Sequence, residues 1–296
     1  MIKKEQDNFP VKELCTTLGV SRSGFYAWRE RQIKPDAAVA PVKEIFWQHS
    51  RRYGSRRIVA ELQAQGFPTG RRHVRRILQQ EKLRAIQPKS FVPRTTNSNH
   101  GRQMSENLLG NMNILRPRQV LVSDITYVPL AGGKWAYLAT WLDLYSRRIL
   151  GWKIAESMTS DLVIGALQQA RKREQLPRGL VLHSDRGGQY VDSDFRQLVK
   201  DNGWQQSMSR AGETYDNAHA ESLWSRYKAE LLEGGSFRDF KEAQLETFQY
   251  IEGYYNRTRR HSALGYRSPE EFERAFFQRT TEGKPSLLTL NERDYS

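Results

Sequence analysis

Three acidic residues fall at positions where a carboxylate could do chemistry. Asp124 lies inside an apolar run, VLVSDITYV, and Asp185 ends a second one, GLVLHSD. Glu221 lies in the first turns of the helix that NAHAESLWSRYKAEL predicts. An acid within a strand of Val, Leu and Ile costs free energy unless something neutralises it. Two such acids and a third on a following helix therefore predict a bound cation.

The cation that carboxylates alone would bind is a hard ion. Mg²⁺ or Mn²⁺ accepts such ligands and keeps water and substrate phosphate in its remaining positions. Two ions, roughly 3.5–4 Å apart, can activate a nucleophile and stabilise the leaving oxygen in phosphoryl transfer. The 35 residues between Asp185 and Glu221 leave room for a helix, a strand and a returning loop.

A stripe of further residues shares the predicted helix with Glu221. Lys228 lies seven residues later, about two turns, so both side chains project from one face. Asn217 lies one turn before Glu221, and Trp224 lies near the same stripe. A lysine there would contact DNA phosphate beside the cation; the alternative is a lysine that only faces water.

The elements that position these acids begin at residue 114. Hydrophobic patterns predict three antiparallel strands, a helix, a short apolar strand, a second helix, a last strand and a long helix. This is the element order of a ribonuclease H-like core, an α/β fold with a mixed five-stranded sheet. The expected segments are 119–130, 134–147, 149–157, 160–174, 179–185, 192–203, 204–209, 217–232 and 237–255.

The charge of the chain is concentrated in its first third. The net charge is +14, and residues 1–100 contain 20 Lys and Arg against 8 Asp and Glu, a net of +12. The remaining residues are close to neutral. A basic excess within helical patterns indicates a polyanionic partner, usually nucleic acid; the alternative is a solubilising basic surface.

Two all-α units are predicted in this basic third. In the first, Gly19 ends one helix and Ser21 caps the next, the pattern of a helix-turn-helix in which Arg22 and Ser23 lead the second helix. A Pro/Ala linker, residues 35–41, precedes the second unit. Its arginine pairs would track DNA phosphates, unless they form a solvated helix face. The arginines proposed to bind DNA there are Arg56, Arg57, Arg71, Arg72, Arg75 and Arg76, with Arg51 and Arg52 forming a fourth pair.

Several ordered motifs together carry a family resemblance. The chain resembles the DDE transposases of bacterial insertion sequences, relatives of retroviral integrases, and more narrowly the downstream-frame protein of the large two-frame family. The matching segments cover nearly all of residues 10–275. They are GVSRSGFYAWRER, YGSRRIVAEL, SDITYV, LDLYSRRILGW, HSDRGGQY, DNAHAESLWSRYKAEL and YYNRTRRHSALGYRSPEEF.

The resemblance implies a role for each matched position. Asp124, Asp185 and Glu221 would bind two Mg²⁺ or Mn²⁺ ions, and Lys228 would contact the element end. Water would cut the strand there, and the freed 3′-hydroxyl would attack another phosphodiester. Double-stranded DNA, further copies of this chain and the upstream-frame protein are the implied partners. No heptad run occurs, so this chain alone need not be the full enzyme.

The predicted organisation follows from these patterns. Residues 1–34 form a helix-turn-helix, 42–87 a second helical DNA-binding domain, 88–113 a linker, 114–275 an integrase-type catalytic core and 276–296 a C-terminal tail.

Cys15 is the only cysteine, which excludes an internal disulfide and a Cys-based zinc site. Neither a signal peptide nor an 18-residue apolar run is found, so we expect a cytoplasmic protein without a membrane span. The resemblance implies that this protein is bacterial and nucleoid-associated.

Other functions compete with this interpretation. His183, Ser184 and Asp185 do not form a hydrolase relay, because adjacent residues in a strand point to opposite faces. Asp143, a fourth acid in a strand, is expected to pair with Arg147 or Arg148. A DNA-binding regulator with an idle catalytic domain, or a structure-specific nuclease of the same fold, remains the alternative. The presence of all three acids favours a transposase over the regulator, and the helical units and closing YYN…HSALGY run favour it over the nuclease.

Overall fold

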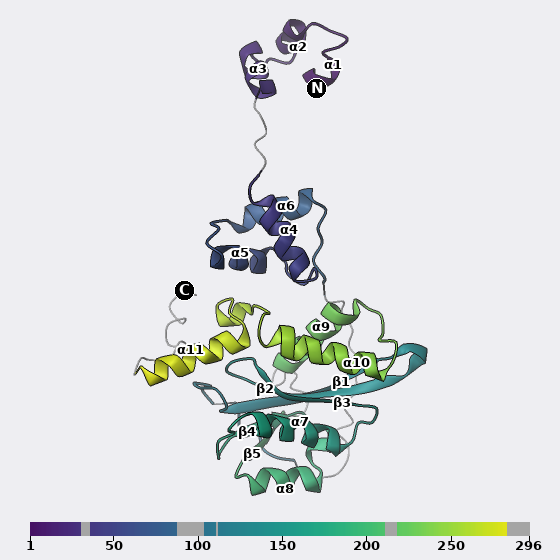
Figure 1. The fold of residues 1–296 in the computed structure, drawn as a ribbon, viewed down its shortest axis with the longest axis vertical. Helices are drawn as coiled ribbons and strands as arrows, with labels where there is room; N and C mark the ends of the chain where they lie inside the picture. Colours follow the sequence, from purple (N-terminus) through teal and green to yellow (C-terminus); the bar gives the residue numbers. More distant parts are fainter. Residues whose placement is uncertain (31–35, 88–103, 111, 211–217, 283–296) are drawn as a thin grey trace.

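The computed structural model describes residues 1–30, 36–87, 104–110, 112–210 and 218–282 (Figure 1). The side chains of 3 and 218–221 lie outside this description. Within it, none of the helices is long and apolar enough to cross a membrane.

The first helical unit consists of α1 (Ile2–Glu5), α2 (Val11–Thr17) and α3 (Arg22–Glu30). The predicted cap is confirmed, because Ser21 Oγ accepts a hydrogen bond from the Gly24 N–H at 3.0 Å. Gly19 has φ 64°, the left-handed conformation that commonly ends a helix. Cys15 is buried with two other apolar side chains, as a small hydrophobe should be.

The second helical unit consists of α4 (Val39–Gln48), α5 (Ser55–Ala64) and α6 (Arg71–Gln80). The linker was predicted to span residues 35–41, but α4 already begins at Val39. Pro41 lies in the first turn, where its missing N–H breaks no helical bond. The core of the unit is formed by Ala38, Val42, Ile45, Phe46, Tyr53, Ile58, Leu62, Val74 and Ile77.

A five-stranded mixed sheet follows, and it has the ribonuclease H-like order β3-β2-β1-β4-β5. β1 pairs antiparallel with β2 and parallel with β4, and β4 pairs parallel with β5. The strands are β1 (Val120–Pro129), β2 (Trp135–Asp143), β3 (Ile149–Ala155), β4 (Val181–Ser184) and β5 (Gln205–Met208). The predicted fold class is confirmed.

Helices cover both faces of this sheet, as Figure 1 shows. α7 (Ser160–Arg173) and α8 (Ser193–Asp201) lie on one face, whereas α9 (Ala218–Leu232) and α10 (Phe240–Phe248) lie on the other. A π-helical segment, Gln249–Tyr255, continues α10, and α11 (Pro269–Thr281) ends the fold. Short 3₁₀ turns span Ala131–Gly133, Gly188–Tyr190 and Ser262–Leu264.

Strand alternation divides the core between the two faces. Val120 and Val122 pack with Trp224 and Tyr250 on the α9 face, whereas Leu121 packs with α7 on the other. Because side chains alternate along a strand, Asp124 is on the same face of β1 as Val120 and Val122. The pattern of β1 thus assigns this acid to the α9 face.

Two predicted domain boundaries differ from the structure. Within the expected linker 88–113, the described residues from 104 pack against the core, since Leu108 N donates to Ser207 Oγ at 2.9 Å and Met208 N to Glu106 O at 3.2 Å. β5 is an edge strand whose polar groups need partners, which explains this packing. The expected tail from 276 is also wrong at its start, because α11 runs to Thr281 and Phe276 packs against Tyr145.

Gly151 allows β3 and α7 to approach closely. A Cβ at this position would lie 2.1 Å from the Ala166 carbonyl oxygen and 2.8 Å from the Ala170 nitrogen. We expect Gly151→Ala to lower the unfolding free energy by about 3 kcal/mol or more in urea denaturation, because backbone atoms must shift. Gly253→Ala is the control, since a Cβ there meets nothing within 4 Å. Equal stability of the two variants would contradict the close approach.

Candidate active site

Asp124 and Asp185 come from neighbouring parallel strands. The pairing of β1 with β4 matches Val122 with His183, and each acid lies two residues beyond its paired residue. Both aspartates are partly exposed. The register therefore brings the two carboxylates to the same level at the edge where β4 ends.

Local hydrogen bonds orient both carboxylates. Asp124 Oδ1 accepts from the Ile125 N–H at 2.8 Å, and its Oδ2 accepts from Trp224 Nε1 at 3.0 Å. Asp185 Oδ1 accepts from the Gly187 N–H at 3.0 Å. A Cβ on Gly187 would itself lie 3.0 Å from that oxygen, so the first glycine of the Gly-Gly turn leaves space for the acid.

Tyr190 is a buried aromatic residue that contacts the strand carrying Asp124. Its hydroxyl hydrogen-bonds Ser123 Oγ at 2.8 Å. Burial raises the pKa of Tyr190 well above its ordinary value, and the charges of Asp185 and Asp124 raise it further. Our sequence analysis did not single out Tyr190, because an aromatic residue after a glycine turn is typical of any core.

The third acid lies on the helix that covers this edge. Glu221 belongs to α9, one turn before Trp224, and its side chain is among those not described. Asn217 lies outside the described residues. Burial lowers the pKa of Lys228, and the nearby Asp124 charge opposes that shift. The predicted stripe of Glu221, Trp224 and Lys228 is thus on the helix whose Trp224 contacts β1.

The imidazole of His183 is held inside the fold. It is fully buried, with Nδ1 at 2.8 Å from Ser207 Oγ and Nε2 at 3.1 Å from Ser209 Oγ. Both ring nitrogens are therefore hydrogen-bonded inside the fold.

The donor set fits a hard divalent cation. Two half-buried carboxylates near one another repel, and a bound cation with oxygen preference relieves that repulsion. Among the side chains that the structure describes, no group of three or more His, Cys, Asp and Glu is assembled. A complete ligand set here requires Glu221, whose helical position is compatible with it.

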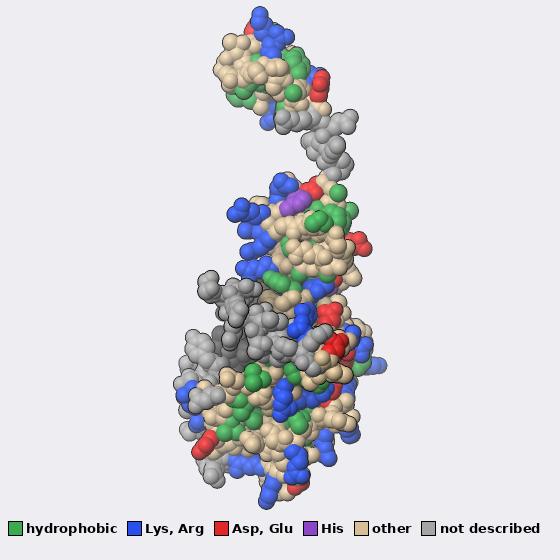
Figure 2. Space-filling model, turned by 90° about the vertical axis from the view of Figure 1, so that its left-hand side faces the viewer, with side chains coloured by type: hydrophobic (Ala, Val, Ile, Leu, Met, Phe, Trp, Pro, Cys, Tyr) green, Lys and Arg blue, Asp and Glu red, His purple; other side chains and the backbone are tan. Residues whose placement is uncertain are grey.

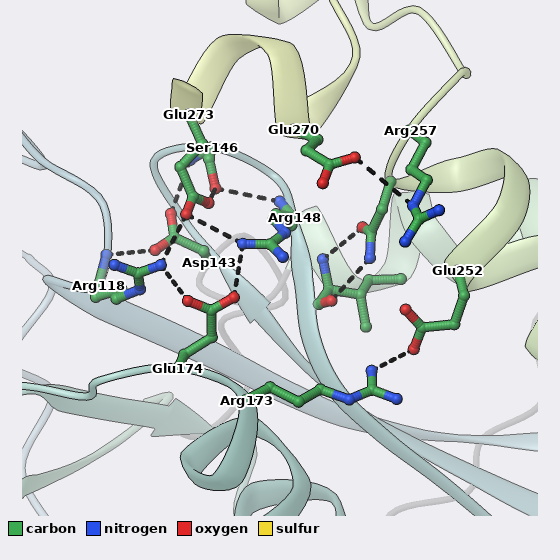
Figure 3. Close-up of polar contacts among 12 residues, drawn as sticks. Arg118, Asp143, Ser146, Arg148, Arg173, Glu174, Glu252, Arg257, Glu270 and Glu273 are labelled. Atoms are coloured by element: carbon green, nitrogen blue, oxygen red, sulfur yellow. Dashed lines mark hydrogen bonds and ion pairs between the residues drawn. The ribbon is translucent and has the colours of Figure 1, made fainter. Parts of the chain in front are cut away.

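Asp143 is not part of this site. It is fully buried and accepts hydrogen bonds from the backbone N–H groups of Arg118, Tyr145 and Ser146. The expected pairing with an arginine side chain is wrong for Arg148. Figure 3 shows that the Arg148 guanidinium instead lies between Glu174 and Glu273, at 2.8 and 3.1 Å. These contacts join α7, the β2–β3 turn and α11.

Exposed basic side chains are found on both helical units. Figure 2 shows Lys and Arg side chains along one side of the second unit. Arg71, Arg72 and Arg75 are exposed on α6, as are Arg56 on α5 and Arg22 and Ser23 at the start of α3. Arg76 is also exposed, although its guanidinium lies 3.6 Å from Asp36. These positions remain available to a polyanion.

Arg57 has to be removed from the predicted DNA contacts. Its Nε donates to the Arg260 carbonyl at 2.8 Å. Arg52, of the preceding arginine pair, donates to the Glu230 carbonyl at 3.3 Å and stacks on the Tyr254 ring. The second helical unit therefore packs on the end of the core that bears the YYNRTRR run. Residue type alone does not reveal whether a guanidinium meets phosphate or protein.

We expect the exposed arginines of α6 to set the salt dependence of DNA binding. Replacing Arg71, Arg72 and Arg75 by Ala should make the negative slope of log affinity against log salt concentration shallower by about 2–3. Each phosphate contact contributes about 0.9 to the magnitude of that slope. Affinity would be measured by fluorescence anisotropy between low and moderate salt. The control replaces three cations on the core, Arg171, Lys172 and Arg238. An equal change of slope in both proteins would refute a specific role for α6.

Family models cover most of the chain. An HTH-like domain matches residues 34–91, and two integrase core domain models match residues 115–214 and 202–269. Among solved structures, a simian T-cell lymphotropic virus intasome aligns with 79% of this chain and 74% of its own, at 14% identity and a TM-score of 0.44. The HTLV-2 integrase catalytic core domain aligns with 54% of this chain and 99% of its own, at 15% identity and a TM-score of 0.39.

Insertion-sequence proteins are similar over nearly their full length. The transposase InsF of insertion sequence IS3A from Escherichia coli (strain K12) is 38% identical over 280 residues, 92% of this chain and 96% of the relative. The IS600 uncharacterized 31 kDa protein from Shigella sonnei is 38% identical over 90% of this chain and 99% of its own. With the sheet order, the helical units and this identity, the chain belongs to the IS3-type DDE transposases of bacterial insertion sequences.

Proposed function

We propose that this transposase cuts DNA at the ends of its element and joins the freed 3′ ends to target DNA. Asp124, Asp185 and Glu221 are the proposed ligands of two Mg²⁺ or Mn²⁺ ions. When bound, these ions supply Lewis-acid stabilisation of the attacking and leaving oxygens. The observation that carries the proposal is the convergence of Asp124 and Asp185 beside the helix that bears Glu221.

The remaining residues of the site would hold and orient DNA. The Lys228 ammonium, half-buried near Asp124, is suited to a phosphate of the element end. Asn217 would contact the same end. The exposed arginines of α6, with Arg56, would bind the backbone, and Arg22 and Ser23 would enter the DNA with α3. Because each reaction joins two ends, we propose that the chain acts as a homo-oligomer, with the upstream-frame protein as fusion or partner.

The direct test is strand cleavage and joining on a labelled element end. The full chain, alone and fused to its upstream frame, is incubated with the element end and target DNA, with Mg²⁺ or with EDTA. We expect joined product only with metal. Binding without any metal-dependent cleavage would support the regulator with an idle catalytic domain. Cleavage at branched DNA without joining would support the structure-specific nuclease.

A further inference from the structure

Trp224 makes the contact that joins helix α9 to the carboxylate of Asp124. Its indole Nε1 donates to Asp124 Oδ2 at 3.0 Å. The ring is only 7% exposed and packs edge-on against Tyr227, with ring centroids 6.2 Å apart. A side chain so tightly enclosed has few alternative rotamers, so its N–H holds a fixed direction.

The chemistry of this donor suits a carboxylate that also binds a metal. An indole N–H donates one hydrogen bond and accepts none, so Trp224 cannot compete with the carboxylate for a cation. It is neutral and therefore adds no positive charge that would repel one. The Ile125 N–H, a second neutral donor, binds the other oxygen of Asp124.

Because of where Trp224 lies in α9, its hydrogen bond also affects how this helix is placed against β1. Glu221 lies one turn before it and Lys228 one turn after it, on the same helical stripe. Asp124 lies 100 residues away in sequence, on β1. The hydrogen bond therefore fixes how α9 is set against the strand that carries the first acid.

We propose that Trp224 is a positioning residue for the divalent-metal site, which orients Asp124 and holds the α9 stripe opposite it. The proposal rests on the proposed function, since it takes Asp124 and Glu221 as ligands. Outer contacts of this kind typically change metal affinity 10- to 100-fold when removed. In this role Trp224 acts through Asp124 and is not itself a metal ligand.

The chain contains a closely matched control. Trp152 is also 7% exposed, and its Nε1 likewise donates to a carboxylate oxygen, Glu252 Oε1, at 2.7 Å. This contact joins β3 to the π-helical segment, and β2 separates β3 from the strand that carries Asp124. Trp152→Phe thus removes an equivalent indole hydrogen bond without altering the acids.

Mn²⁺ binding is measured with the full chain in the absence of DNA. Electron paramagnetic resonance quantifies the Mn²⁺ that stays free in solution, and the affinity is obtained from it. We expect Trp224→Phe to weaken Mn²⁺ binding about tenfold, Trp152→Phe to leave it unchanged, and Asp124→Asn to weaken it most. Unchanged affinity in Trp224→Phe, with binding lost in Asp124→Asn, would overturn the positioning role and spare the proposed function. Wild-type affinity in Asp124→Asn would instead overturn the proposed metal site.

A second measurement does not use Trp224→Phe, in case that variant does not fold. In ¹⁵N-labelled protein, the indole N–H resonance that Asp124→Asn perturbs identifies Trp224. We expect Mg²⁺ to shift this resonance and to leave that of Trp152 in place, because only the first donor bonds a metal ligand. A Trp224 resonance that stays in place at saturating Mg²⁺ would overturn the proposal.

Discussion

Replacing Asp124 or Asp185 by Asn, or Glu221 by Gln, is expected to abolish strand cleavage and joining while DNA binding stays within a few-fold of wild type. Each change removes a negative oxygen ligand but keeps the side-chain shape. Loss of a metal ligand removes several kcal/mol of transition-state stabilisation, so we expect rates to fall by at least about 10³-fold.

Two comparisons make this prediction specific. Product is quantified from a labelled element end under single-turnover conditions, and binding is measured separately by anisotropy. Asp161→Asn, an exposed acid in the first turn of α7, is the control and should react at the wild-type rate. Residual activity above a few per cent in any of the three variants would remove that residue from the metal site.

Breaking the buried ion pair between Glu230 and Arg259 is expected to cost about 3–5 kcal/mol of unfolding free energy. Arg259 Nη2 lies 2.6 Å from Glu230 Oε1, and Tyr250 donates to Glu230 Oε2 at 2.8 Å. Both charged side chains are almost completely buried. Glu230→Gln would therefore leave an uncompensated guanidinium inside the core that holds the C-terminal half of α9.

The measurement is urea denaturation of the full chain at neutral pH. Arg257→Ala is the control, because this neighbouring arginine is exposed and lies 3.8 Å from its partner Glu270. A surface pair of that kind contributes about 0–1 kcal/mol. If Glu230→Gln were as stable as Arg257→Ala, the buried pair would have no net stabilising role.

The pH dependence of stability provides an independent check on the same pair. Burial alone would raise the pKa of the Glu230 carboxyl, but Arg259 and the Tyr250 hydroxyl outweigh it and hold the pKa below the ordinary value of 4.5. A carboxyl whose folded pKa is depressed stabilises the fold above its unfolded pKa, and that contribution is lost as pH falls through the folded value. The stability gap between wild type and Glu230→Gln should therefore narrow below about pH 4.5.

Much of the fold could be predicted from the sequence because its signals are local. Hydrophobic patterns predicted a strand over 119–130, and β1 spans Val120–Pro129. The order of elements then implied the mixed sheet that the structure has. Asp124 and Asp185 stood out for the same reason, since an acid in an apolar strand is unusual over a window of a few residues.

Contacts between distant segments were decided by the tertiary structure alone. Arg57 and Arg71 look alike in sequence, yet the first binds the Arg260 carbonyl and the second is exposed. Asp143 was expected to pair with Arg147 or Arg148, yet Arg148 binds Glu174 and Glu273, and Asp143 accepts hydrogen bonds from three backbone N–H groups. The hydrogen bond from Trp224 to Asp124 depends on how a helix crosses a strand 100 residues away. Periodicity determines which face of an element is apolar; packing in three dimensions determines what that face meets.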